Sequence, residues 1–407
     1  MAERLTQIKD HIVSAVSPSI TDSRPDDVVV VTAYRSAIAK GFKGGFKDVN
    51  SDYLVHQFLQ EFLEKAPAAV RENKHFIQEV ACGNVLNPGA GATEHRAACL
   101  AAGVPYTAPF VAINRQCSSG LIAINDVANK IKVGQIDMGL AMGAESMSKN
   151  YGPQALGNVS KELKQDKNAR KCMIPMGITN ENVTQQFHIS RESQDAFAAE
   201  SYRKAENAVS NGLFEDEILP IRLPDGTVIS VDEGPRKGVT ADNLSLLKPA
   251  FNKESGTTTA GNASQISDGV AAVLLTRRSV AESMELPILA KYVACQVVGV
   301  PPEIMGVGPA YAIPKVLKDC KLNVQDIDVF EINEAFAGQA LYCIDKLKIP
   351  MAKVNPRGGA IALGHPLGCT GARQVATILR ELKAGQVGVV SMCVGTGMGA
   401  AAVFVKE

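Results

Sequence analysis

The 407-residue chain has no tryptophan, no excess charge of either sign and no long apolar run. Its 42 basic and 42 acidic residues give a net charge of 0, which does not favour nucleic acid or an anionic membrane as a main partner. No apolar run reaches the roughly 18 residues that a membrane-spanning helix needs. We therefore expect a soluble protein, and its 46% hydrophobic content and 35 glycines are ordinary for an α/β enzyme.

The usual signatures of metal sites and disulfide frameworks are also missing. The nine cysteines contain no CxxC pair, and the six histidines show no His-x-x-x-His spacing. The cysteines are odd in number and widely spread, unlike those of small secreted proteins. We expect free thiols in a reducing compartment and no metal site.

The length predicts two or three domains, at roughly 100 to 200 residues each. Residues 27–32 predict a buried first strand, because β-branched residues run without interruption there. The fold proper is expected to begin with this strand. Residues 1–26 are polar and read as an extension.

Two segments repeat the order of a helix, a Gly-Gln pair and an apolar strand. They cover residues 121–142 and 372–392, and a shift of 251 residues places Gly134 on Gly385. We interpret this repeat as an internal duplication. Two α/β halves built alike would present loops at corresponding strand ends, so a site between them is expected.

The duplication defines the predicted domain boundaries. Residues 147–266 interrupt it with polar, glycine-containing sequence and are predicted to form an inserted loop subdomain. The N-terminal half then comprises residues 27–146 plus 267–285, and the C-terminal half comprises residues 286–407. Residues 1–26 lie outside both halves.

Cys117 is the candidate nucleophile. It stands just before a predicted helix and is followed by Ser-Ser-Gly, so free backbone N–H groups and the positive helix end would favour a thiolate. The alternative is a packed core thiol, since cysteine is among the most buried residue types.

His365 is the candidate base. It lies in a glycine-flanked loop, residues 359–368, where an imidazole could approach a ligand closely. Under the duplication it corresponds to Asn114, three residues before Cys117, so the two loops should face each other. A structural histidine is the alternative.

Two further candidates end apolar strands. Cys393 leads into a loop with alternating glycines, including Gly395, whose N–H groups could face an anion. Asn333 follows the apolar residues 327–332, at the strand end where ligands bind in open α/β sheets. The alternatives are a tight turn after Cys393 and a helix N-cap at Asn333.

Together these segments resemble the thiolase family in order and spacing. The resemblance runs from about Val28 to the C-terminus and rests on RQCSSG, GNASQISDG, EINEAF, NPRGGAIALGHPLGCTG and SMCVGTGMG. It implies the thiolase fold, with two duplicated α/β halves in a layered αβαβα arrangement and an inserted loop subdomain. Residues 174–183 are similar to degradative 3-ketoacyl-CoA thiolases, and in detail the chain resembles the peroxisomal thiolases of yeasts and other fungi.

The resemblance implies an acyltransferase with a covalent acyl-cysteine intermediate. Cys117 would attack the keto carbon while His365 takes its proton, and the N–H groups of Cys117 and Gly395 would hold the alkoxide. The expelled enolate oxygen would be held by His365 and by a water fixed by Asn333. Cys393 would protonate the enolate carbon and later deprotonate CoA. CoA is a substrate here, and no metal or redox cofactor is expected.

Two more residues take roles only from the resemblance. Ser264 matches a serine that contacts the pantetheine arm of CoA, and Met176 matches a residue near the acyl pocket. The last loop reads CVGTGMG where many relatives have three consecutive glycines. The resemblance also implies a homodimer, with tetramers found in the family.

We predict a degradative 3-ketoacyl-CoA thiolase acting in the last step of fatty-acid β-oxidation. The nearest alternative is a biosynthetic acetyl-CoA C-acetyltransferase, also called acetoacetyl-CoA thiolase, which shares the motifs but differs in its acyl pocket. A decarboxylating ketoacyl synthase usually pairs its cysteine with a second histidine or asparagine, so Cys393 fits it less well. A silent scaffold or acyl-CoA-binding protein would have no need of Cys117, Asn333, His365 and Cys393 together.

The N-terminal tail resembles a peroxisomal targeting signal read by an import receptor. The pattern consists of Arg4 and Leu5, five residues, then His11 and Ile12, although leucine or alanine is commoner at its last position. The chain ends in Val-Lys-Glu, which is not an SKL-type signal. We therefore expect residues 1–26 to be a targeting extension and the protein to reside in the peroxisomal matrix.

Overall fold

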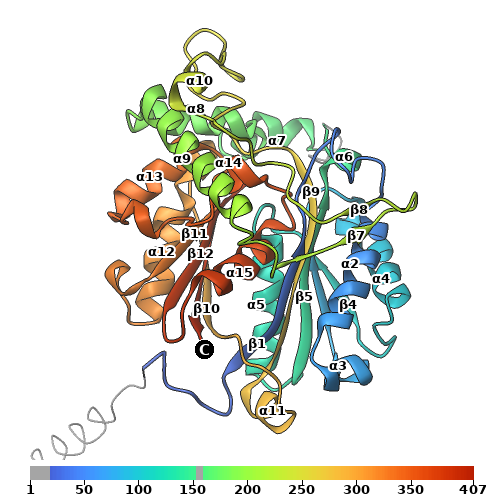
Figure 1. Ribbon diagram of the computed structural model, residues 1–407. Helices are drawn as coiled ribbons and strands as arrows, with labels where there is room; N and C mark the ends of the chain where they lie inside the picture. The colour runs from blue at the N-terminus through green and yellow to red at the C-terminus, as the bar shows by residue number, and fades with distance from the viewer. Residues whose placement is uncertain (1–18, 153–158) are drawn as a thin grey trace, which may run out of the picture.

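One mixed β-sheet runs through both halves of the computed structural model, which describes residues 19–152 and 159–407 (Figure 1). In the N-terminal half the strand order is β1-β9-β5-β3-β4, where β3, β4 and β5 are parallel and β9 is antiparallel to β1 and β5. These strands are β1 (Val28–Ser36), β3 (Val80–Gly83), β4 (Phe110–Ile113), β5 (Met138–Ser146) and β9 (Ser267–Arg277).

The C-terminal half repeats this arrangement. Its order is β10-β13-β12-β11, where β11 and β12 are parallel and β13 is antiparallel to β12 and β10. The strands are β10 (Ala290–Gly299), β11 (Val329–Ile332), β12 (Val387–Val394) and β13 (Met398–Lys406). The parallel and antiparallel pairings therefore follow the same order in both halves. The halves join where β1 pairs with β10 over Val28, Val29 and Val30.

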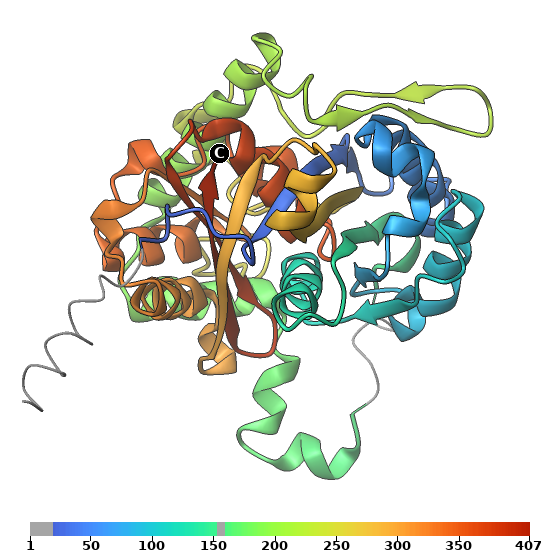
Figure 2. The same cartoon turned by 90° about the horizontal axis from the view of Figure 1, so that it is seen from below.

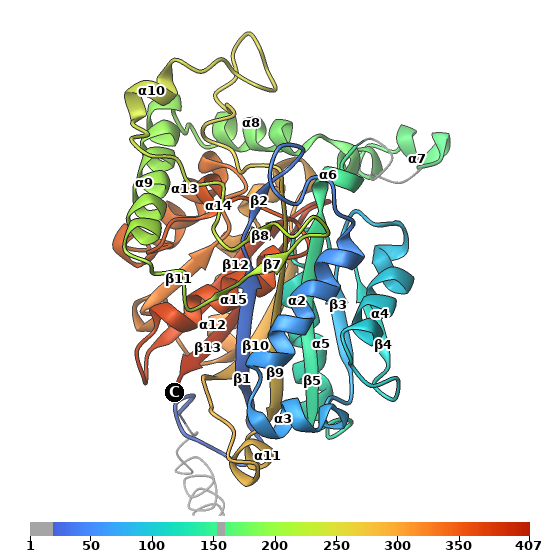
Figure 3. The same cartoon turned by 45° about the vertical axis from the view of Figure 1, so that its right-hand side comes forward.

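Helices form three layers around and between the two parts of the sheet (Figures 1 and 3). The inner layer is α5 (Ser119–Lys132) and α15 (Thr370–Glu381). One outer face carries α2 (Ser51–Lys65), α3 (Ala68–Glu72) and α4 (Ala92–Ala101), and the other carries α12 (Gly308–Asp319) and α13 (Ala337–Leu347). Three short elements complete the two halves: β2 (Ala39–Lys40), α11 (Arg278–Ser283) and the buried α14 (Ala360–Leu363). The predicted layered αβαβα fold is confirmed.

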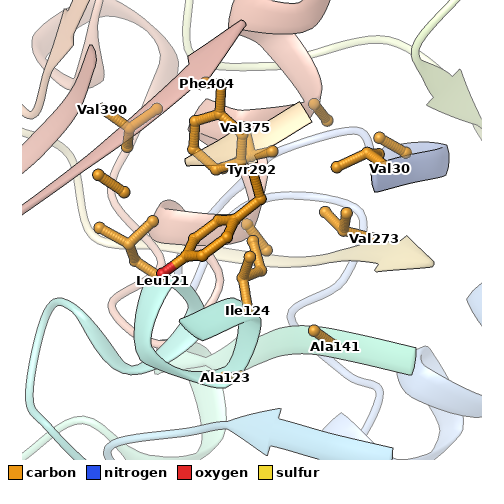
Figure 4. Packing of buried hydrophobic residues seen from close by; sticks show 14 of the residues in the cluster. Val30, Leu121, Ala123, Ile124, Ala141, Val273, Tyr292, Val375, Val390 and Phe404 are labelled. Carbon is orange, nitrogen blue, oxygen red and sulfur yellow. The ribbon is translucent and has the colours of Figure 1, made fainter. Parts of the chain in front are cut away.

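The inner layer lies in a hydrophobic core to which both halves contribute. Apolar side chains from both parts of the sheet close on α5 and α15, as Figure 4 shows for Val30, Leu121, Ala123, Ile124, Ala141, Val273, Tyr292, Val375, Val390 and Phe404. Each large aliphatic or aromatic side chain buried in this way contributes about 1.5–3 kcal/mol. Because α15 is buried on all sides from Thr370 to Leu379, each of its polar side chains needs a partner within the protein.

The inner helices touch closely at their N-terminal ends. A Cβ added to Gly120 would lie 2.6 Å from the carbonyl oxygen of Gly368 and 3.5 Å from Cβ of Ala372. The reciprocal contact joins Gly371 to Leu121, and the 251-residue shift exchanges the Gly120–Ala372 and Gly371–Leu121 pairs. Only glycine allows this approach. The contact brings together the two loops that precede these helices.

The segment between β5 and β9 forms an excursion along one end of the molecule. Its described elements are α6 (Met147–Asn150), α7 (Lys161–Gln165), α8 (Met176–Gln186), α9 (Arg191–Ser210), β6 (Ile218–Leu219), β7 (Ile221–Arg222), β8 (Val228–Ile229) and α10 (Ala241–Ser245). Helix α7 projects outward, and the β7–β8 hairpin reaches over α2, where the Tyr53 hydroxyl donates to the Arg222 carbonyl (Figures 2 and 3).

Parts of this inserted segment pack against the two halves. Helix α9 contributes Phe197, Ala198 and Tyr202 to the same hydrophobic cluster as α12 and α13 of the C-terminal half. Strand β6 pairs with the end of β1. The separateness of the predicted subdomain 147–266 and the exact domain boundaries stay predictions. Residues 1–18, which carry the predicted targeting pattern, lie outside the described residues.

Candidate active site

Cys117 lies just before α5, in a strained turn. Gln116, the preceding residue, has φ of 47°, a left-handed conformation that costs energy for a non-glycine residue. The thiol is 9% exposed, and the backbone N–H groups of Gly395 and of Cys117 itself face its sulfur. Two backbone donors, one from the Cys117 turn and one from the loop after β12, therefore lie beside the sulfur.

Burial decides the protonation of Cys117. It raises the pKa of the thiol to about 11, and the two backbone N–H groups only partly oppose this shift. The backbone N–H groups favour a thiolate, as expected from the sequence, but desolvation outweighs them, and position before a helix does not reveal the desolvation. At neutral pH the Cys117 side chain is therefore a thiol.

Cys393 lies at the end of β12 and is fully buried. Burial raises the pKa of its thiol well above the ordinary value, and the neighbouring Cys117 raises it further. The two thiols thus lie close enough for Cys117 to affect the pKa of Cys393, although they come from different halves of the chain. All nine cysteines are free.

His365 follows Gly364, whose φ of 109° is accessible mainly to glycine. This turn directs the His365 N–H to the carbonyl of Gln265, at 3.1 Å. The ring is 4% exposed, and burial together with the charge of Arg373 lowers its pKa to about 3. The imidazole is therefore neutral at physiological pH and able to accept a proton.

Asn333 contacts the imidazole directly. Its Nδ2 lies 3.3 Å from Nε2 of His365. Its Oδ1 is one of the few buried side-chain atoms in the described residues without a hydrogen-bond partner. Because α13 begins only at Ala337, Asn333 is not an N-cap and the bland alternative for this residue is wrong. The amide is instead fixed beside the His365 ring, with an unpartnered acceptor oxygen.

The other two predicted site residues lie around this centre. The backbone N–H of Ser264 donates to the carbonyl of Ala335, at 3.0 Å, so the Ser264 segment runs beside the Asn333 segment. Met176, the first residue of α8, packs against a small apolar cluster that contains Phe336 and Cys393. The structure therefore brings all the predicted site residues onto adjoining segments. They are Cys117, Cys393, His365, Asn333, Gly395, Ser264 and Met176. Their chemical roles stay predictions.

Sequence reasoning missed Glu145, at the end of β5. Its buried carboxylate accepts hydrogen bonds of 2.9–3.2 Å from the Asn84 side chain and from the N–H groups of Val85, Leu86 and Gly368. Burial raises its pKa to about 7. The predicted strand stopped at residue 142, so no signal marked this residue. Glu145 ties the loop after β3 to the loop that carries His365.

Two surface hollows lie away from these residues, and the described residues contain no group that could hold a metal ion. Within residues 19–152 and 159–407, no three His, Cys, Asp or Glu side chains are grouped to hold a metal ion. Hollows of about 330 and 460 Å³ lie elsewhere, near Met284 and near Leu322. No helix in the described part of the chain is long and apolar enough to cross a bilayer.

Comparison with known proteins identifies both halves. The thiolase N-terminal domain family matches residues 28–279, and the thiolase C-terminal domain family matches residues 286–406. The peroxisomal 3-ketoacyl-CoA thiolase of Saccharomyces cerevisiae is 67% identical over 417 residues, which cover 100% of both chains.

Solved structures give the same picture. The crystal structure of the dimeric peroxisomal thiolase of Saccharomyces cerevisiae has a TM-score of 0.94 at 69% identity, covering 95% of this chain and 99% of that chain. An acetyl-CoA acetyltransferase of Bacillus anthracis has a TM-score of 0.83 at 37% identity, covering 94% and 99%. The duplicated fold and these matches define an acyltransferase. The chain belongs to the thiolase family.

Proposed function

We propose that this protein is a degradative 3-ketoacyl-CoA thiolase of fatty-acid β-oxidation. It cleaves a 3-ketoacyl-CoA with CoA to give acetyl-CoA and an acyl-CoA shortened by the acetyl unit. The observation that carries the proposal is the full-length 67% identity to a peroxisomal 3-ketoacyl-CoA thiolase. The clustering of the two thiols, the imidazole and the amide supports the chemistry.

In the first step the Cys117 sulfur attacks the keto carbon and passes its proton to Nε2 of His365. A carbon-sulfur bond forms, and the carbonyl oxygen becomes an alkoxide. Because the resting site disfavours both a thiolate and an imidazolium, this proton transfer is favourable only when the alkoxide accepts charge. The N–H groups of Cys117 and Gly395 stabilise that oxygen, at about 3–4 kcal/mol for a donor of this kind.

In the second step the alkoxide collapses and breaks the carbon-carbon bond. The acyl group stays on Cys117 as a thioester, and the electron pair leaves as the enolate of acetyl-CoA. The enolate oxygen is held by the protonated His365 and by a water on Oδ1 of Asn333. The Cys393 thiol then protonates the enolate carbon, which releases acetyl-CoA and leaves a Cys393 thiolate.

The last step regenerates the enzyme. The Cys393 thiolate takes the proton of incoming CoA, whose sulfur attacks the acyl thioester on Cys117. Collapse of this second tetrahedral intermediate releases the shortened acyl-CoA, and His365 returns its proton to Cys117. Ser264 contacts the pantetheine arm and Met176 borders the acyl chain. The cycle balances its protons and electrons without a metal or a redox cofactor.

CoA-dependent thiolysis of short, medium and long 3-ketoacyl-CoAs tests the proposal. We expect turnover of medium- and long-chain 3-ketoacyl-CoAs. It is measured by the loss of 3-ketoacyl-CoA absorbance and by the release of acetyl-CoA. Turnover restricted to acetoacetyl-CoA would instead support the acetyl-CoA C-acetyltransferase, which the similarity to the Bacillus anthracis enzyme keeps in view. No turnover at any length would support an acyl-CoA-binding protein.

The protein is further proposed to be a peroxisomal matrix homodimer. Its relatives from Saccharomyces cerevisiae, Candida tropicalis and Yarrowia lipolytica are named as peroxisomal enzymes, and one solved relative is described as dimeric. Import through a receptor that reads Arg4, Leu5, His11 and Ile12 is part of this proposal.

Substitution of the targeting pattern should separate location from catalysis. We expect Arg4→Ala and His11→Ala each to leave the protein in the cytosol with unchanged thiolase activity, because this extension precedes the first strand of the fold. Fluorescence microscopy of tagged protein measures import, and Ser14→Ala is the matched control in the same tail. Unchanged peroxisomal import of both variants would contradict the signal.

A further inference from the structure

The second ring nitrogen of His365 has a partner that the reaction above does not use. Nδ1 of His365 lies 2.6 Å from Oγ1 of Thr370, the first residue of α15. The Thr370 hydroxyl also donates to the Pro366 carbonyl, at 3.0 Å, one helical turn back. Thr370 is fully buried, so within this site its hydroxyl has no access to bulk solvent.

These contacts favour one of the two tautomers of the imidazole. A hydroxyl has a single hydrogen, and donation to the Pro366 carbonyl leaves Oγ1 of Thr370 as an acceptor. Nδ1 of His365 then carries the ring proton and donates it to Oγ1. Nε2 is left with its lone pair toward Nδ2 of Asn333. A proton on Nε2 would instead point at another donor.

We propose that Thr370 is a positioning residue that fixes His365 in the tautomer with Nδ1 protonated and Nε2 free. This inference rests on the proposed function, in which Nε2 takes the proton of Cys117. Thr370 touches no reacting atom and acts through the imidazole. It fills the place that a carboxylate occupies in Ser-His-Asp enzymes, but it carries no charge.

The neutral partner suits a base that must also return its proton. Once Nε2 accepts the proton, Nδ1–H of His365 still donates to the Thr370 hydroxyl, and the positive charge stays on the ring. A carboxylate at this place would stabilise that charge and hold the proton more firmly. Arg373, on the same helix, acts in the opposite sense and lowers the pKa of His365. The proton is therefore readily released in the last step.

Three variants of the full-length enzyme test this role. Thr370→Val keeps the shape but removes the acceptor, Thr370→Ser keeps the hydroxyl, and Thr377→Val removes a buried threonine on the same helix that donates to Glu217. For Thr370→Val we expect kcat to fall about 10- to 100-fold, equivalent to about 1.4–2.7 kcal/mol, with KM changed less than about threefold. Thr370→Ser and Thr377→Val should retain kcat within about threefold.

Nitrogen NMR of the histidine-labelled enzyme supplies a readout that does not depend on turnover. In the wild type, the His365 signals should show a protonated Nδ1 and an unprotonated Nε2 at neutral pH. His365→Gln assigns the signals by their loss. In Thr370→Val the two tautomers should become mixed, whereas Thr370→Ser should keep the wild-type pattern.

A wild-type spectrum with the proton on Nε2 would overturn the proposal, and so would full kcat in Thr370→Val. If Thr370→Val does not fold, the wild-type spectrum and the serine variant still decide the question. Failure of the proposed function gives a different result. The wild-type enzyme would then not cleave 3-ketoacyl-CoAs, whatever its tautomer.

Discussion

Cys117→Ala should lower thiolysis by at least about 10⁴-fold, because no other group can carry the acyl chain. The loss should appear in kcat, since the side chain bonds covalently to substrate only after binding. Steady-state assays with a medium-chain 3-ketoacyl-CoA measure it. Mass spectrometry of the wild type incubated with acyl-CoA should find the acyl group on Cys117.

Cys99→Ala is the control for this prediction. Cys99 is a fully buried thiol on α4, in the core of the outer layer, and contacts no predicted site residue. Its replacement should retain kcat within about threefold and cost about 1 kcal/mol of unfolding free energy. Comparable loss of activity in both variants, or persistent turnover in Cys117→Ala, would remove Cys117 from its role.

Cys393→Ala should lower thiolysis by about 10²- to 10⁴-fold, the range for loss of a general acid or base. The enolate then lacks its proton donor and CoA lacks its base. The same variant should lose exchange of the acetyl-CoA methyl protons with heavy water, which the wild type should catalyse. Labelling of Cys117 by iodoacetamide should persist, because the nucleophile and His365 remain.

Cys343→Ala provides the matched control for Cys393. Cys343 is a fully buried thiol on α13 that acts electrostatically on Cys393. Its removal should leave proton exchange and thiolysis within about threefold of the wild type. If Cys393→Ala retained proton exchange, the acid and base role would have to move to another residue.

Much of the fold was predictable because the duplication is visible in local patterns. The helix expected in the repeat segment 121–142 is α5, and the strand expected in the segment 372–392 is β12. The loop positions of Cys117 and His365 follow from the helices that come after them. Their proximity follows from the 251-residue repeat, since pseudo-symmetric loops meet at one interface.

The remaining features depend on contacts between distant parts of the chain. Glu145 binds Gly368, 223 residues away, and α9 packs into the C-terminal half across the inserted segment. The raised pKa of Cys117 depends on burial by both halves, which a single segment does not encode. The sequence does not single out Thr370, because burial of α15 on all sides is what makes its hydroxyl depend on a partner within the protein. That burial is a property of the folded chain.

The contact between α5 and α15 also bears on when the proposed site is complete during synthesis of the chain. Cys117 belongs to the half that is translated first, whereas His365, Asn333 and Cys393 all follow β10. Gly395 and His365 can therefore lie beside Cys117 only when the second half has docked and Gly120 packs against Ala372. A nascent chain that ends before β10 thus carries Cys117 without the groups proposed to act on it, and the proposed acyl transfer requires the second half as well.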